Sequence, residues 1–212
     1  MRLLLTVSSI LLLSISFITY AGLSDSTIHS LKRKAKTGDP HAQLKLGNRA
    51  LVHSHYKQAY KWFKRLSRQD NQKQSSKGFS SLGLLYMLNH GPYSKNYKKA
   101  RYYFKKALQL GDKGVYGNLG GIYYDGGHGI KQDKQKAKHY YYLGAQHGNP
   151  SAQFNLGSLY ANQKQYKKAF HWYHQSAKQY YLSGMLQTAL SYSLGKGVNK
   201  DKIKLVNGLK LL

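Results

Sequence analysis

The chain has 212 residues and carries 34 lysine and arginine residues against seven aspartates, with no glutamate, for a formal net charge of +27 at pH 7. Cysteine is absent, which excludes disulfide scaffolds and cysteine-ligated metal centres. A surface this positive attracts anionic partners, whatever the fold beneath it.

Residues 1–21 are predicted to be a secretory signal peptide. Met1-Arg2 forms a short basic start, residues 3–18 are uncharged and rich in Leu, Ile and Ser, and Ala21 marks the expected cleavage site. The apolar stretch is short for the ~20 residues of a membrane-spanning helix, which favours cleavage over an uncleaved anchor. No cysteine follows it to carry a lipid. The predicted location is therefore periplasmic or secreted.

Residues 22–37 are predicted to form an N-terminal capping helix. Ile28, Leu31 and Ala35 lie at helical spacing, and Gly38 follows as a helix end. We expect this helix to cover the first unit of a repeat domain that spans residues 38–212.

The repeat domain is recognised by a recurring Leu-Gly pair. Segment 38–47 returns at 148–157 with six identical positions, and the Leu-Gly pair recurs at steps of 36, 37 and 37 residues. A weaker fifth copy occupies residues 188–192. Steps of this length are typical of arrays of helix pairs. The anchoring glycines are Gly47, Gly83, Gly120 and Gly157.

The second half of each repeat is predicted to be an amphipathic helix. Each such segment starts at an alanine and has aromatic residues three and four positions later. This spacing places the aromatic residues on one helical face, which is stable only when a neighbouring repeat covers it. The aromatic pairs are Trp62/Phe63, Tyr103/Phe104, Tyr140/Tyr141 and Trp172/Tyr173.

The loop between the two helices of a repeat is predicted to have two lengths. The first and fourth repeats have a short loop, whereas longer loops are expected at residues 89–96, 125–133 and 195–201. The last two share Gly-x-Gly-[Ile/Val]-x-x-Asp, in which the glycines allow a tight reversal and the Asp caps the next helix. Asn96 takes the same cap position in the first long loop. No strand precedes the Gly-x-Gly motif, which disfavours a phosphate-binding loop.

These motifs resemble the Sel1-like repeat family, a relative of the tetratricopeptide repeats with an enlarged loop between its helices. The family pattern is most complete over residues 115–148 and extends from residue 38 to about 210. The resemblance implies an all-α, right-handed α/α solenoid of about five helix-pair repeats that binds proteins and has no catalytic residues. By analogy the first helices line a partner-binding groove, for which the candidate residues are His41, Asn48, Lys77, Tyr124, Ser151 and Asn162.

Enzyme and metal hypotheses find little support in the sequence. Segment 36–38 and the Ser-x-x-Lys pairs that start at Ser54 and Ser193 match boxes of penicillin-recognising serine enzymes, but their order is wrong and a Ser-Asp-Asn box is absent. The histidine pairs 53/55 and 171/174 lack a third ligand nearby, so solvated surface is favoured over a metal site. We predict neither catalytic residues nor a cofactor.

The preferred hypothesis is a secreted or periplasmic scaffold that binds a protein of the cell envelope or of a host cell. One alternative is a basic binder of anionic polymer or lipid headgroups, such as peptidoglycan or lipopolysaccharide, whose affinity would fall with salt and rise below about pH 6 as histidines gain charge. The family resemblance adds a flagellar-motor accessory as another alternative. Nucleic acid is disfavoured, because the aromatic residues beside the lysines lie at core spacing rather than where bases could stack.

Overall fold

The computed structural model describes residues 24–88 and 95–201, and the regular structure in these ranges is helical apart from one isolated bridge between Gly127 and Ile130. The predicted signal peptide and the residues after 201 lie outside the described residues. The all-α prediction is confirmed. The elements are α2 Asp25–Lys36, α3 Pro40–Val52, α4 Tyr56–Leu66, α5 Gln72–Met87, α6 Tyr97–Gln109, the 3-10 helix η2 Lys113–Val115, α7 Tyr116–Asp125, α8 Lys134–Gln146, α9 Pro150–Asn162, α10 Tyr166–Ala177 and α11 Leu182–Leu194.

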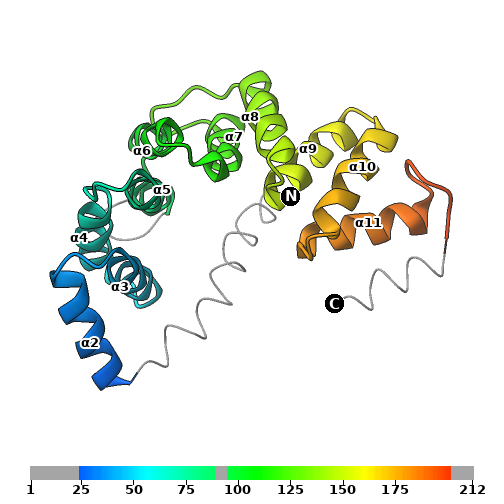
Figure 1. The fold of residues 1–212 in the computed structure, drawn as a ribbon. Helices are drawn as coiled ribbons and strands as arrows, with labels where there is room; N and C mark the ends of the chain where they lie inside the picture. The colour runs from blue at the N-terminus through cyan, green and yellow to red at the C-terminus, as the bar shows by residue number, and fades with distance from the viewer. Residues whose placement is uncertain (1–23, 89–94, 202–212) are drawn as a thin grey trace. The chain divides into compact units, whose positions relative to one another are not determined.

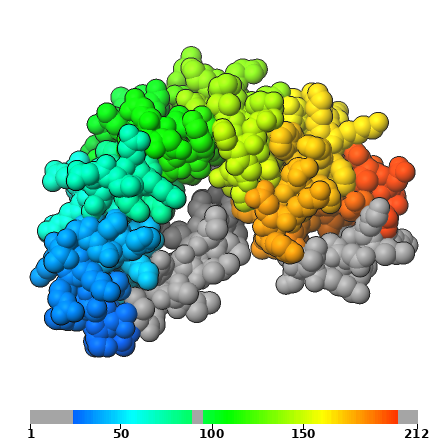
Figure 2. All heavy atoms as spheres, viewed as in Figure 1, coloured from blue at the N-terminus to red at the C-terminus, as the bar shows by residue number. Residues whose placement is uncertain are grey.

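Helices adjacent in sequence pack against each other in pairs (Figure 1). The pairs α3/α4, α5/α6, α7/α8 and α9/α10 are the four complete repeats, and α11 is the first helix of the fifth. The described chain divides into two compact units, 24–88 with 95–115 and 126–131, and 116–125 with 132–201. Within each unit the colours of Figure 2 follow one another in chain order, as expected for repeats that contact their sequence neighbours.

The anchoring glycines are required because an aromatic ring of the second helix lies directly on them. Phe63 packs on Gly47, Phe104 on Gly83, and the pattern recurs with Tyr141 and Tyr173 in the next two repeats. A Cβ atom at Gly157 would lie 2.8 Å from the ring of Tyr173, inside van der Waals contact. All four rings are buried, which confirms the predicted aromatic face of the second helices.

The duplicated segment encodes a helix start and a buried glutamine. Asp39 caps α3 by accepting a hydrogen bond from the backbone amide of Ala42, and Asn149 caps α9 by accepting one from the amide of Ala152. Gln153, which is buried, donates through Nε2 to the carbonyl of Ala145 and accepts from Gln179 at 2.8 Å. Gln43 makes the equivalent pair of bonds in the first repeat. Each glutamine therefore links the preceding helix to the turn that ends its own repeat.

The long loop of the third repeat follows the predicted design, and the long loop of the fifth repeat makes one further contact. Residues 89–94 of the first predicted long loop lie outside the described residues. Gly127 and Gly129 have φ of +80° and +84°, Ile130 is buried, and Asp133 caps α8 by accepting from the amide of Lys136. In the fifth repeat Gly197 lies directly on the backbone of Tyr166, the first residue of α10. A side chain at that glycine would collide with the preceding second helix, so the motif also joins successive repeats.

Helix α2 packs on the first helix of the first repeat. Ala35 is buried against Ala42 and Leu46, and Leu31 is partly buried beside them. Ser24 caps the helix by accepting a hydrogen bond from the Thr27 amide. The segment predicted to cap the array is therefore helical from Asp25, and its function as an end cap stays a prediction.

Candidate functional site

The six candidate groove residues all lie on first helices. His41 and Asn48 are on α3, and Lys77 is on α5, in the first unit. Three of the six, the residues 41, 77 and 151, occupy the same repeat position, six residues before the anchoring glycine. The second unit holds Tyr124 on α7 with Ser151 and Asn162 on α9.

The six residues differ in how much of their side chain is available. His41 and Asn162 are exposed, whereas the other four are half-buried. The ring centroid of Tyr124 is 6.4 Å from that of Tyr141 on α8, so Tyr124 contributes to packing within its own repeat. The remaining candidates leave a polar or charged group on the surface of their helix.

The first helices of the two units differ in charge. In the first unit, α3 and α5 carry Lys45, Arg49, Lys73 and Lys77. In the second unit, α7, α9 and α11 carry no lysine, arginine or histidine. The second helices α4, α6, α8 and α10 are basic in both units. The difference is thus confined to the helices that hold the candidate residues.

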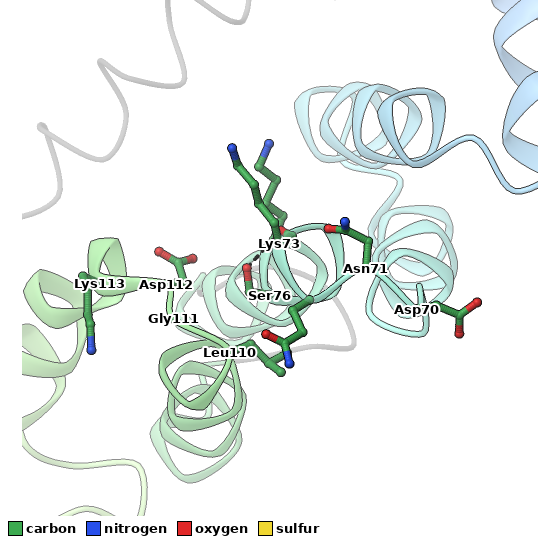
Figure 3. A pocket seen from close by; sticks show the side chains of 10 residues that line it. Asp70, Asn71, Lys73, Ser76, Leu110, Gly111, Asp112 and Lys113 are labelled. Atoms are coloured by element: carbon green, nitrogen blue, oxygen red, sulfur yellow. Dashed lines mark hydrogen bonds between the residues drawn. The ribbon is translucent and has the colours of Figure 1, made fainter.

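Lys77 is one of the residues that line a pocket in the first unit. Figure 3 shows this pocket with Lys73 and Asp112 among its labelled lining residues. The pocket has a volume of about 850 Å³ and lies between the turn that precedes α5 and the turn that follows α6. Both turns join successive repeats, so the repeat itself brings them to the same edge of the unit. The lining residues are Asp70, Asn71, Gln72, Lys73, Ser76, Lys77, Leu110, Gly111, Asp112 and Lys113.

The polar groups of the pocket are only partly used by the fold. The Asn71 side chain caps α5 by accepting from the Gln74 amide at 3.2 Å, and Ser76 donates to the carbonyl of Lys73. Asp112 accepts from the amide of Gly114 through Oδ1 at 3.0 Å. Lys73 points outward from α5, with Asp70 and Asp112 on opposite sides of it in Figure 3. The arrangement offers cationic groups to a ligand that enters the pocket.

Perturbed pKa values are found in both units. In the first unit, burial raises the pKa of Tyr103 on α6. In the second unit, burial raises the pKa of Tyr173 on α10. Burial lowers the pKa of His174, and the charges of Lys178 and His171 lower it further. The Nδ1 atom of His174 is buried and lacks a hydrogen-bond partner within the described residues, and its ring stacks on Phe170 at 5.6 Å. These features place His174 in the packing of α10.

A capped helix start explains the lowered pKa of Asp133. The backbone amide of Lys136 lowers the pKa of Asp133 by hydrogen bonding to its carboxylate. The ammonium of Lys136 lies 2.9 Å from the same carboxylate. This ion pair stabilises the start of α8 and leaves the pocket unaffected.

The structure assigns local structural positions to the motifs that suggested enzyme or metal chemistry. Segment 36–38 forms the end of α2, where Thr37 is the C-cap and Gly38 has a φ of +103°. Ser54 belongs to the short loop after α3, with a φ of +59°. Within residues 24–88 and 95–201, no three His, Cys, Asp or Glu side chains gather where they could hold a metal ion. Likewise, no helix in these ranges has the length and apolar character needed to span a membrane.

The sequence pointed to Lys77 but not to the pocket around it. Turn residues such as Asn71, Asp112 and Lys113 fall between the predicted helices, and one repeat of sequence separates the two turns. The repeat period could have predicted that these two turns are neighbours, because turns one period apart fall on the same edge of a stacked array.

Comparison with known proteins gives the family of the repeats. A family model described as Sel1 repeat matches residues 40–71, 81–112, 116–149, 150–181 and 182–209, well over half of the chain. No curated protein matches the chain.

Two solved structures are similar to the chain over most of its length. A Sel1 repeat protein from Oxalobacter formigenes is 28% identical with a TM-score of 0.71, and the match covers 87% of this chain and 74% of that one. The second is c5321, described as a protective antigen present in uropathogenic Escherichia coli strains displaying an SLR fold, at 29% identity and a TM-score of 0.66. That match covers 87% of this chain but only 40% of c5321.

Proposed function

The chain belongs to the Sel1 repeat family, and we propose that it is a non-catalytic scaffold that binds partner proteins through the exposed sides of its first helices. The observation that carries this proposal is the separation of packing from surface within each repeat. The anchoring position is glycine in all four complete repeats, whereas the position six residues earlier is His41, Lys77 or Ser151 in three of them. Packing requires glycine at the anchoring position, whereas the residue six positions earlier is free to vary and can be specific for a ligand.

The partner is expected in the cell envelope or on a host cell. The layout of residues 1–21 supports export from the cytosol. In the mature chain, residues 22–37 would cap the array and residues 38–212 would form the repeat domain. Export is tested by N-terminal sequencing of the protein from the cells that make it, which should give a chain that starts at Gly22.

The scaffold function is tested by in-cell crosslinking with matched charge variants. One variant carries Lys77→Glu and Ser151→Glu, which alter a first helix in each unit. The control carries Lys57→Glu and Lys167→Gln, which alter exposed residues on a second helix in each unit and give the same change in net charge as the first variant. We expect the partner captured by the wild-type chain to be lost from the first-helix variant and kept by the control. Capture that depends only on the second helices would contradict the proposal.

A second candidate function is the binding of anionic envelope polymer or lipid headgroups. It is favoured by α6, whose exposed side presents Lys98, Lys99, Lys105 and Lys106 around Tyr102, which is 56% exposed. Screening by salt weakens interactions between exposed charges. Sedimentation with peptidoglycan or anionic vesicles should then fall steeply between low and moderate salt, and it should be lost on charge reversal of α6 rather than of α5.

A further inference from the structure

In the pocket beside Lys77, first-helix charge and a hollow surface coincide. We propose that this pocket binds an acidic, carboxylate-bearing segment of the partner protein. The inference rests on the scaffold function proposed above and specifies the chemistry of the partner.

Two lysines of α5 provide the attraction. Lys73 and Lys77 are one helical turn apart, so they lie on the same side of α5, and both line the pocket. Lys73 is exposed and Lys77 is half-buried. A charge on a concave surface is less screened than one on a flat face, so this pair should attract carboxylates more strongly than lysines on an open helix face.

The two aspartates of the lining restrict the kind of anion. Asp70 and Asp112 lie in the same pocket as the lysines, and they would repel a polymer that carries a charge on every unit. A polypeptide avoids this repulsion, because its acidic side chains can meet the lysines while its neutral or basic residues lie near the aspartates. The mixed lining therefore favours a protein segment over nucleic acid or a polyphosphate.

The shape and polarity of the pocket agree with a polypeptide. A pocket of about 850 Å³ between two turns admits side chains, whereas the headgroups of a lipid bilayer present a broad surface that fits an open helix face better. Asn71 and Gln72 offer amide groups to a peptide backbone, and Leu110 is the only aliphatic side chain among the lining residues. An apolar small molecule would find few partners there.

The test measures binding of defined probes to the purified chain. The probe is a fluorescein-labelled peptide of alternating glutamate and serine, about twelve residues long, which spans roughly 40 Å when extended. The control peptide has glutamine at each glutamate position. Vesicles of phosphatidylcholine with phosphatidylglycerol provide the lipid arm, and all titrations are made at about 0.15 M salt so that exposed charges are screened.

Three variants distinguish the pocket from general basicity. The pocket variant carries Lys73→Glu and Lys77→Glu, and the control carries Lys105→Glu and Lys106→Glu on α6 of the same unit, which is the same change in net charge. The third variant, Asp70→Asn, removes a repulsive carboxylate from an exposed position. A gain in affinity cannot arise from misfolding, so this variant remains informative if the pocket variant is unstable.

We expect the pocket variant to bind the glutamate peptide about tenfold more weakly, the control to change by less than about threefold, and Asp70→Asn to bind about twofold more tightly. Equal losses in the two double variants, equal binding of the glutamine peptide, or a pocket effect seen only with vesicles would each overturn the inference. If the peptide fails to bind while in-cell capture still depends on the first helices, the acidic segment is wrong and the scaffold function stands.

Discussion

The first helices of the two units share their packing but not their surfaces. In both units an anchoring glycine, such as Gly83 on α5 or Gly157 on α9, receives an aromatic ring from the second helix. Yet α3 and α5 expose basic residues, whereas α7, α9 and α11 have none. The comparison teaches that packing fixes one set of positions and leaves another free to differ, and the proposed scaffold function assigns recognition to the second set. Recognition can therefore differ between units at little cost to the fold.

The largest effect is expected where the two units are the same. Gly83→Ala and Gly157→Ala each place a Cβ atom within 3 Å of a buried ring, and overpacking of this kind destabilises by about 2 kcal/mol. Thermal unfolding should show a similar loss of stability for both variants. The matched control is Gly121→Ala, whose Cβ would meet only the Tyr141 hydroxyl at 3.9 Å and should stabilise α7 by up to about 1 kcal/mol. A loss of stability for only one of the two variants would contradict the claim that the units share this packing.

Removal of a buried glutamine is a second test of whether the two units share their packing, with a smaller expected loss of stability. Gln43→Ala and Gln153→Ala each remove two hydrogen bonds of a buried side chain, one to a backbone carbonyl and one from a second glutamine, at a cost of about 1–2 kcal/mol. The control is Gln58→Ala, because Gln58 is exposed on α4. Chemical denaturation should give comparable losses for the two buried sites, and unchanged stability would show that these hydrogen bonds are dispensable.

An exchange of surface residues tests the difference between the units. Lys77→Ser should leave the free energy of unfolding within about 0.5 kcal/mol of the wild type and weaken binding of an acidic peptide about threefold. Ser151→Lys, at the same repeat position, should not compensate, because α7, α9 and α11 offer no neighbouring first-helix lysine. Full compensation would mean that net charge, rather than the pocket, determines binding.

The smallest effect concerns pH and should be confined to the second unit. Because burial lowers the pKa of His174, the unfolded chain binds a proton at higher pH than the folded chain does. Its contribution to stability is therefore complete above the ordinary histidine pKa of about 6.5 and declines as the pH falls through the lower folded value. Melting curves at several pH values should show that His174→Gln flattens this decline. The exposed control His139→Gln should retain it, and identical profiles for the two variants would refute the assignment.

Periodicity made the fold predictable from the sequence. The Leu-Gly anchors, the aromatic pairs and the caps Asp39, Asn96, Asp133 and Asn149 all lie at positions that local rules can identify. The pairing of Gln153 with Gln179 was not predicted, because it joins residues 26 positions apart through one partly buried hydrogen bond. Tyr180 is a second example, since it has a φ of +56° at a turn where Gly38 and Gly148 serve in other repeats.

The candidate site was predictable only in part. Analogy directed attention to the first helices, and their function in binding stays a prediction. The half-burial and packing of Tyr124 depend on the ring that faces it across the repeat. The pocket depends on two turns that become neighbours only when the repeats stack. Surface positions carry no periodic signal, because packing does not constrain them.

The claim that first helices carry recognition is tested most directly by site-specific photocrosslinking in the cells that make the protein. A benzoylphenylalanine is placed at position 77, at position 151, or at the exposed second-helix position 105, one per chain, and the crosslinked products are identified by mass spectrometry. We predict that the same partner protein is crosslinked from position 77 or 151 and not from position 105. A partner crosslinked from position 105 alone would contradict the account.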